Sequence, residues 1–349
     1  MKKLNNLHSV LVVVCLSFIM GSCATTQSKY AEMHLANKAK TDNSELNGSV
    51  QGKNVEKLMD MTLFKAVELD VPYAFGGRTN PAQRLDIVYP SVGEAPYKVI
   101  VVFHGGEWAY GDKESETISS ILVATTQGYA VVSVNYRLSS QAIWPAPIYD
   151  AKAAVRFIRA NAEKYNLDAS KIVAWGNSAG GHLVEMLAAT NGNSEYEDLT
   201  MGSANASSDV QGIVSWYGVA NMADFPKVKD PANQEMGFNT QIPEFKVKTQ
   251  KASPLYLVTK DFPPTLLVHG TDDQVVPYRQ SVELFNEITN VCGPGRVTLK
   301  TFEGSGHDDP AIKTWDNVMN NLNFVDQIIW PDGQNPYRNN DKIEIKVLK

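Results

Sequence analysis

The sequence predicts an α/β protein with a mostly parallel sheet that is covered by helices on both faces. Short apolar segments bounded by turn residues alternate with segments in which apolar residues recur at helical spacing. This alternation is typical of parallel sheets, because each crossover between neighbouring strands places a helix on a face of the sheet. Apolar residues make up 43% of the 349-residue chain, which is enough for a globular protein with a large core.

Individual elements follow from this alternation. Residues 84–89 and residues 71–75 are expected to be antiparallel edge strands at the start of the sheet. Apolar stripes at helical spacing predict a helix that carries Ile148 and Ile158, and another that carries Ile312 and Ile329. The buried strands are expected at residues 98–104, 129–136, 171–175, 210–217, 265–269 and 297–302.

One connection is much longer than the others. It lies between the strands expected at 210–217 and 265–269 and is rich in Pro, Asn and Lys. Connections of this length in compact domains carry a function or a structure of their own. Residues 219–263 are therefore expected to form an insertion over the active site, within a single domain that covers residues 56–349.

The N-terminal residues predict export. Two lysines precede an apolar stretch at residues 10–20, and small residues follow it, so residues 1–22 have the pattern of a secretory signal peptide. Residues 20–23 also resemble a bacterial lipobox, in which Cys23 would carry the lipid; the pattern more often has Leu at the position of Met20. The alternative is a plain signal peptide followed by an unrelated cysteine. Residues 23–55 are polar and are expected to be a tether.

Charge and cysteine content narrow the choice of partners. The formal net charge is -6 and no basic run occurs, which argues against nucleic acid as a partner. Of the three cysteines, Cys15 lies in the signal and Cys23 at the lipobox, so Cys292 has no partner for an intrachain disulfide. We therefore expect export, to the periplasm or cell surface, with the membrane contacted through a lipid at Cys23.

A candidate nucleophile lies in the segment Gly-Asn-Ser-Ala-Gly at residues 176–180. It follows an expected strand and precedes a helical pattern, which is the strand–turn–helix context in which a serine is held on a tight turn. Glycines two residues before and after Ser178 avoid a clash between the strand and the helix. The turn exposes the hydroxyl of Ser178 above the positive end of the following helix.

A serine hydroxyl needs a base, and elimination among the six histidines favours His307. His307 lies in a glycine-rich loop between an expected strand and a helix, from which a side chain can reach the nucleophile. The others are assigned elsewhere: His8 to the signal, His34 to the tether, His104 to a loop that it holds in place, His182 to a helix too close to the serine, and His269 to the core.

An acid and an oxyanion hole complete the arrangement. Asp272 and Asp273 both follow the strand expected at residues 265–269, and the residues alone do not separate them. The resulting order, Ser then Asp then His, is that of the α/β-hydrolase fold. The two glycines of His-Gly-Gly-Glu-Trp at residues 104–108 allow backbone N–H groups to face a reacting carbonyl, together with the N–H of Ala179.

The chain resembles α/β-hydrolases of the hormone-sensitive-lipase and feruloyl-esterase type from about residue 70 to residue 330. The segments that carry the resemblance are residues 104–108, Asn-Tyr-Arg-Leu at 135–138, residues 176–183, Asp-Gln-Val-Val-Pro at 273–277 and Gly-His at 306–307. The resemblance implies that Asp273 is the acid and that the oxyanion donors are the backbone N–H groups of Gly106, Glu107 and Ala179. Many relatives have a third glycine in place of Glu107, and its carboxylate would disfavour an anionic acyl group.

These observations predict a serine carboxylic-ester hydrolase that works through Ser178, His307 and Asp273. Export and the resemblance favour acetyl or feruloyl groups on plant polysaccharide. Two alternatives remain: an amidase or peptidase of the aryl-formamide hydrolase or prolyl-oligopeptidase type, and a non-catalytic binding lipoprotein on the same fold. No cofactor is implied, and the residues around His307 lack the spacing of metal ligands. Five aromatic residues near strand ends would either stack on substrate or pack in the core: Trp108, Tyr110, Trp144, Trp216 and Tyr217.

Overall fold

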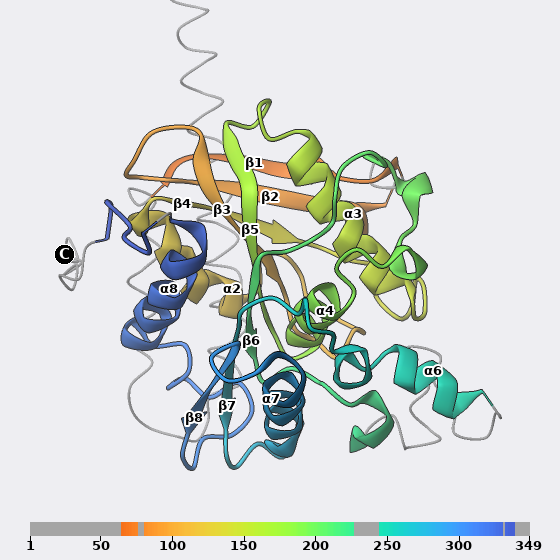
Figure 1. Ribbon diagram of the computed structural model, residues 1–349. Coiled ribbons are helices and arrows are strands. Elements are labelled where there is room, and N and C mark those ends of the chain that lie inside the picture. Colours follow the sequence, from red (N-terminus) through yellow and green to blue (C-terminus); the bar gives the residue numbers. More distant parts are fainter. Residues whose placement is uncertain (1–63, 76–79, 227–243, 331, 339–349) are drawn as a thin grey trace, which may run out of the picture. The chain divides into compact units, whose positions relative to one another are not determined.

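The computed structural model describes residues 64–75, 80–226, 244–330 and 332–338 (Figure 1). The predicted signal peptide, the tether and Cys23 lie outside the described residues. Of the predicted insertion, residues 219–226 and 244–263 are described. Within the part of the chain that the structure describes, no helix is both long and apolar enough to cross a membrane.

Eight strands form one sheet in the order β1-β2-β4-β3-β5-β6-β7-β8. From β4 to β8 every neighbouring pair is parallel, and β2 runs antiparallel to both of its neighbours, β1 and β4. The predicted mostly parallel sheet is therefore confirmed. The strands are β1 (Phe64–Pro72), β2 (Arg84–Pro90), β3 (Tyr97–Phe103), β4 (Tyr129–Val134), β5 (Leu167–Asn177), β6 (Gly212–Trp216), β7 (Thr265–Gly270) and β8 (Val297–Phe302).

The first strand is an antiparallel edge strand, as predicted, but its predicted bounds are wrong. A strand was predicted at residues 71–75, whereas β1 ends at Pro72 and extends back to Phe64. Val67, Leu69 and Val71 alternate with more exposed residues, which is the pattern of an edge strand with one buried face. Pro72 still lies opposite Arg84, and the N–H of Tyr73 donates to the carbonyl of Gln83 at 3.2 Å just beyond the strand. Residues 84–89 do form a strand, but it lies between β1 and β4 rather than at the edge.

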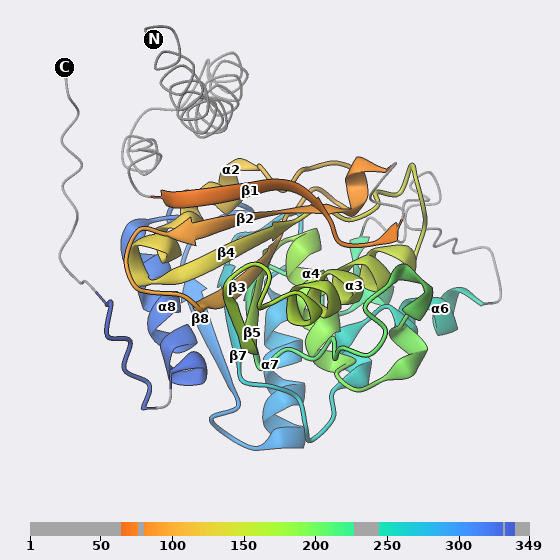
Figure 2. The same ribbon diagram turned by 90° about the horizontal axis from the view of Figure 1, so that it is seen from above.

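Helices cover both faces of the sheet (Figures 1 and 2). Figure 1 shows α2 (Glu116–Ile121) and α8 (Trp315–Ile329) on one side, and α3 (Ala146–Ala160), α4 (Ala179–Ala189) and α7 (Arg279–Cys292) on the other. The two predicted apolar stripes are confirmed, because Ile148 and Ile158 of α3 and Ile329 of α8 are buried, as is Ile312 just before α8. Helix α7 was not among the predicted helices.

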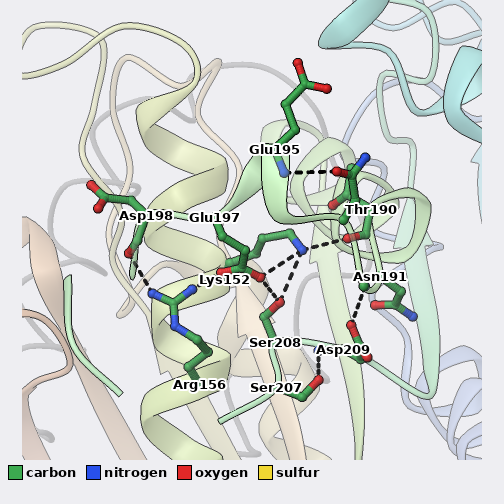
Figure 3. A network of polar contacts seen from close by, with 12 residues as sticks. Lys152, Arg156, Thr190, Asn191, Glu195, Glu197, Asp198, Ser207, Ser208 and Asp209 are labelled. Carbon is green, nitrogen blue, oxygen red and sulfur yellow. Dashed lines mark hydrogen bonds and ion pairs between the residues drawn. The ribbon is translucent and has the colours of Figure 1, made fainter. Parts of the chain in front are cut away.

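A buried polar network fastens the segment after α4 to α3 (Figure 3). Lys152 Nζ, which is fully buried, donates to the carbonyl of Thr190 at 2.7 Å and lies 3.2 Å from both Glu197 Oε1 and Ser208 Oγ. Arg156, one turn further along α3, pairs with the other carboxylate oxygen of Glu197. Burial lowers the pKa of Lys152, and the Glu197 carboxylate opposes that effect. Both cations are satisfied by acceptors, so the network holds a loop and leaves no open site.

Candidate active site

Ser178 lies on the turn that joins β5 to α4, as predicted. Its backbone has φ 53° and ψ −115°, a strained combination for a residue with a side chain. The glycines on either side are required by close contacts: a Cβ atom at Gly176 would lie 2.3 Å from the carbonyl oxygen of Gly180, and one at Gly180 would lie 2.0 Å from that of Phe103. The Ser178 N–H donates to the carbonyl of Trp216 at 2.9 Å, which ties the turn to β6.

His307 and Asp273 meet Ser178 from two separate loops. His307 follows β8, and its Nε2 lies 3.0 Å from Ser178 Oγ. Asp273 follows β7, and its Oδ2 lies 2.7 Å from His307 Nδ1. Strands β5, β7 and β8 are parallel, so their carboxyl ends meet at the same edge of the sheet. The structure therefore brings the three predicted residues into one continuous hydrogen-bonded chain.

Asp273, and not Asp272, occupies this chain. The Asp273 side chain is fully buried, and its second oxygen, Oδ1, accepts the N–H groups of Val275 and Val276, both at 2.8 Å. Asp272 is exposed, and the structure records its backbone N–H bonded to the carbonyl of Ser305 at 3.0 Å. Burial disfavours the charged form of Asp273, but hydrogen bonds from His269 and His307 outweigh burial and hold the pKa of this carboxyl well below its usual range. Asp273 is therefore an anion at neutral pH.

His269 is a core residue, as predicted, but it also contacts the acid. Its Nε2 lies 2.9 Å from the carbonyl oxygen of Val276 and 3.2 Å from Asp273 Oδ2. Both neighbours are acceptors, so the proton must reside on Nε2, while Nδ1 accepts the hydroxyl of Ser281 at 2.7 Å. His269 thus supports the acid at Oδ2, the same oxygen that accepts from His307. Its spacing of four residues from Asp273 was the only sign of this contact in the sequence.

The predicted oxyanion loop follows β3 and lies against the nucleophile turn. Gly105 N–H donates to Asn177 Oδ1 at 3.0 Å, and a Cβ atom at Gly105 would lie 3.3 Å from the Cβ of Ser178. Gly106, Glu107 and Trp108 all have positive φ, of 113°, 55° and 59°. Glu107 therefore adopts the left-handed conformation at the position where many relatives have a third glycine. The replacement of that glycine by Glu107 keeps a backbone N–H group at this position of the loop. Ala179 is the first residue of α4, so its N–H has no acceptor within the helix.

The motif Asn-Tyr-Arg-Leu, which follows β4, holds both ends of this loop. Asn135 Oδ1 accepts the N–H of Lys113 at 2.5 Å, and its amide nitrogen donates to Asp112 Oδ2 at 2.9 Å. Tyr136 donates to the carbonyl of His104 at 2.9 Å and stacks on the His104 ring with 4.4 Å between centroids. Burial lowers the pKa of His104 to about 4, so its ring is neutral at neutral pH. The prediction that His104 holds the loop in place is confirmed.

The middle of the loop is held by His182 in α4. Trp108 Nε1 donates to His182 Nδ1 at 3.2 Å, and His182 Nε2 lies 2.8 Å from the carbonyl of Ala252. Burial lowers the pKa of His182 to about 4, which keeps Nδ1 free to accept at neutral pH. Ala252 follows α6 (Phe245–Lys251), so His182 joins the oxyanion loop to the described part of the insertion. His182 is not the base, as predicted, but its role in holding the loop was not predicted.

The five aromatic residues near strand ends divide into two groups. Trp108, Trp216 and Tyr217 are buried, so for them the prediction of core packing is confirmed. Tyr110 is 59% exposed, and Trp144 is half-buried. Among the described residues, no group of three His, Cys, Asp or Glu side chains could hold a metal ion.

Comparison with known proteins places the chain in a family. The family described as BD-FAE matches residues 85–288, more than half of the chain. The chain belongs to this family. The BD-FAE match begins in β2 and ends in α7, so it includes Ser178 and Asp273 and ends before His307.

Named esterases and solved structures are also similar to this chain. Esterase LipC of Mycobacterium tuberculosis is 29% identical over 231 residues, which are 65% of this chain and 57% of LipC; the chain therefore spans less than two thirds of that relative. A truncated carbohydrate esterase from gut microbiota has a TM-score of 0.67 at 29% identity, covering 76% of this chain and 97% of that one. The bifunctional GH43-CE protein of Bacteroides eggerthii has a TM-score of 0.66 at 30% identity, covering 75% of this chain and 38% of that one. The predicted α/β-hydrolase fold is confirmed by these structures.

Proposed function

We propose that this protein is a serine carboxylic-ester hydrolase in which Ser178 is the nucleophile, His307 the general base and Asp273 the acid that orients it. The observation that carries the proposal is the continuous chain from Ser178 Oγ through both ring nitrogens of His307 to Asp273 Oδ2, with distances of 3.0 Å and 2.7 Å. The anionic Asp273 requires the proton of neutral His307 to lie on Nδ1. Nε2 is then free to accept the hydroxyl proton of Ser178.

The reaction follows from this geometry. Ser178 Oγ attacks the ester carbonyl as its proton passes to His307 Nε2, and the N–H groups of Gly106, Glu107 and Ala179 receive the oxyanion. The intermediate collapses as Nε2–H protonates the leaving alkoxide, which departs as the alcohol. Water, deprotonated by the same Nε2, then attacks the acyl-enzyme and releases the acid, with the proton returned to Ser178.

For the substrate we propose neutral acyl esters, with acetyl or feruloyl groups on plant polysaccharide as the natural class. Membership of the BD-FAE family and the similarity to a carbohydrate esterase from gut microbiota support this choice. The carboxylate of Glu107, in the middle of the oxyanion loop, disfavours an anionic acyl group nearby. The esterase relatives also favour ester over amide cleavage.

Hydrolysis of a short panel by the mature domain tests this proposal. The panel holds an aryl acetate, methyl ferulate, acetylated xylan, an aryl hemisuccinate and an aryl formamide. We expect turnover of the neutral esters and a loss of at least about 10⁴-fold in kcat with Ser178→Ala. Ser120→Ala is the matched control, because it removes a buried hydroxyl that donates to the carbonyl of Thr117 in α2. Inactivity of the wild type on every ester, or equal activity of Ser178→Ala, would exclude the proposed chemistry.

We also propose that the protein is exported and anchored in a bacterial membrane through a lipid on Cys23, at the periplasmic or cell-surface side. The support is the order of the basic start, the apolar stretch and the lipobox-like residues 20–23. Fractionation of cells that express the full chain tests this. Wild type should sediment with membranes, whereas Cys23→Ser should not; equal distribution of the two would contradict a lipid anchor.

A further inference from the structure

Tyr217 and Asp308 make a second set of contacts around His307, on elements other than the one that carries Asp273. Asp308 follows His307 directly, and Tyr217 follows β6. The hydroxyl of Tyr217 donates to Asp308 Oδ1 at 2.6 Å. The ring of Tyr217 also lies against the His307 imidazole, with 4.7 Å between centroids and 65° between planes. One phenol therefore touches the base through its ring and the residue beside the base through its hydroxyl.

Both residues adopt backbone conformations that side chains disfavour. Tyr217 has φ 41° and Asp308 has φ 57°. A bulky residue at positive φ is strained and persists only where its surroundings hold it. At Tyr217 the backbone N–H donates to the carbonyl of Val268 at 2.8 Å, which fastens the residue to β7. At these two strained positions the side chains contact each other.

Asp308 is held from two further elements. Thr117 Oγ1 of α2 lies 3.3 Å from Asp308 Oδ1, and Lys313 Nζ, just before α8, lies 3.2 Å from Oδ2. Tyr217 itself is fully buried. Burial and the Asp308 carboxylate keep the pKa of Tyr217 well above its usual value, so the phenol remains a hydrogen-bond donor. The carboxylate thus connects the His307 loop to α2, to β6 and to the segment before α8.

The loop before His307 is hydrogen-bonded to the turn after β7 through Thr271 and Asp272, but one of its sides has few neighbours. Gly304 has φ 71°, and a Cβ atom at Gly304 or at Gly306 would meet nothing within 4 Å, so this side of the loop is loosely packed. The bond to Asp273 fixes one ring nitrogen of His307. The ring contact from Tyr217, with the next residue fastened through Asp308, restrains the ring at a second place.

We propose that Tyr217 and Asp308 form a positioning pair that holds the His307 ring so that Nε2 stays within reach of Ser178 Oγ. This inference rests on the proposed function, in which His307 is the base. Neither residue touches the reacting atoms. Their effect is therefore on kcat, through the geometry of His307, and not on the binding of the substrate.

Kinetics of four variants with an aryl acetate test the pair. Tyr217→Phe keeps the ring and removes the bond to Asp308, and Asp308→Ala removes the acceptor; each should lower kcat about tenfold with KM within about twofold. Tyr217→Phe also removes the hydrogen bond between the phenol and the Asn177 side chain. The double variant should be as slow as the slower single variant, and the two losses should not multiply, because both changes break the contact between Tyr217 and Asp308. Asp308→Asn keeps an oxygen that accepts the phenol and should retain most of the activity. Tyr196→Phe, which removes another buried hydroxyl from its bond to the carbonyl of Lys251, should match the wild type.

The proposal is overturned if Tyr217→Phe and Asp308→Ala retain wild-type kcat, if their losses multiply in the double variant, or if KM rises while kcat is unchanged. Urea unfolding of each variant separates loss of fold from loss of position. Proton NMR of the His307 Nδ1–H gives a readout that needs no substrate, with His307→Asn to assign the signal. Faster exchange of this proton in Tyr217→Phe, but not in Tyr196→Phe, supports the pair even if the wild type is inactive on esters. In that case the proposed function fails and the positioning pair stands.

Discussion

Replacement of Gly106 by alanine tests whether the conformation of the oxyanion loop limits the rate. A Cβ atom at Gly106 would lie 2.1 Å from the carbonyl oxygen of Tyr110, where real contacts exceed 3.0 Å. The loop must therefore open by about 1 Å. Movement is restricted because Gly106 accepts the N–H groups of Ala109 and Tyr110, at 2.9 Å and 3.0 Å, so the turn is displaced as a unit.

The expected magnitude follows from this displacement. A misplacement of about 1 Å in catalytic geometry costs about 10²-fold in rate. Loss of one oxyanion donor costs about 10²–10³-fold in kcat, or about 2.7–4 kcal/mol of transition-state stabilisation. Gly106→Ala should therefore lower kcat on an aryl acetate at least about 10²-fold with little change in KM. Alanine at a positive φ should also lower the free energy of unfolding by about 1–2 kcal/mol.

Gly192→Ala is the matched control. Gly192 also has positive φ, 68°, but a Cβ atom there would meet nothing within 4 Å. It should therefore lose about 1–2 kcal/mol in the free energy of unfolding from its positive φ alone, without the added cost of the clash at Gly106, while kcat stays within about twofold of the wild type. A Gly106→Ala enzyme that folds and keeps kcat within about threefold of the wild type would refute the assignment of this loop as the oxyanion hole.

Three further predictions concern neighbouring residues. Asp273→Asn should lower kcat about 10³–10⁴-fold at neutral pH, because an amide does not hold His307 in the required tautomer; a loss under tenfold would contradict the role of Asp273. Trp108→Phe removes the donor to the buried His182 Nδ1, so the free energy of unfolding should fall by about 1–3 kcal/mol and kcat should fall severalfold; wild-type values of both would contradict the link. Burial raises the pKa of Glu185 in α4 to about 8, so the folded state holds a proton that the unfolded state releases above pH 4.5. This contribution to stability is complete below pH 4.5 and is lost as pH rises toward 8, so Glu185→Gln should gain stability relative to the wild type between pH 5 and pH 8 in urea unfolding; a constant difference would contradict the shifted pKa.

The fold class, Ser178, His307 and the turn that carries the acid were predictable because their signals are local in the chain. Apolar strands and amphipathic helices each show their period within a few residues. The glycines around Ser178 are required because a Cβ atom at either position would clash with a nearby backbone carbonyl. The loop position of His307 and the order Ser, Asp, His along the chain then predicted that these residues act together in one active site. These signals did not separate Asp272 from Asp273, since neighbours in a turn differ only in the direction of their side chains.

Contacts between segments far apart in the chain could not be predicted from the sequence. The bond from Trp108 to His182 joins residues 74 positions apart, and that from Tyr217 to Asp308 joins residues 91 positions apart. No residue type or spacing marks such a pair in a single chain. The first strand was misplaced for a different reason, because the alternation of Val67, Leu69 and Val71 with polar residues is visible in the sequence and was missed.

The sequence by itself determined the class of fold, the strand–turn–helix that presents Ser178 and the loops that carry His307 and the acid. These features depend on periodicity and on turn chemistry, which act over a few neighbouring residues. Only the tertiary structure decided that Asp273 faces His307, that His269 supports Asp273 and that Tyr217 and Asp308 surround the base. Those choices depend on which strands become neighbours in the sheet, because the parallel arrangement brings the ends of β5, β6, β7 and β8 to one edge.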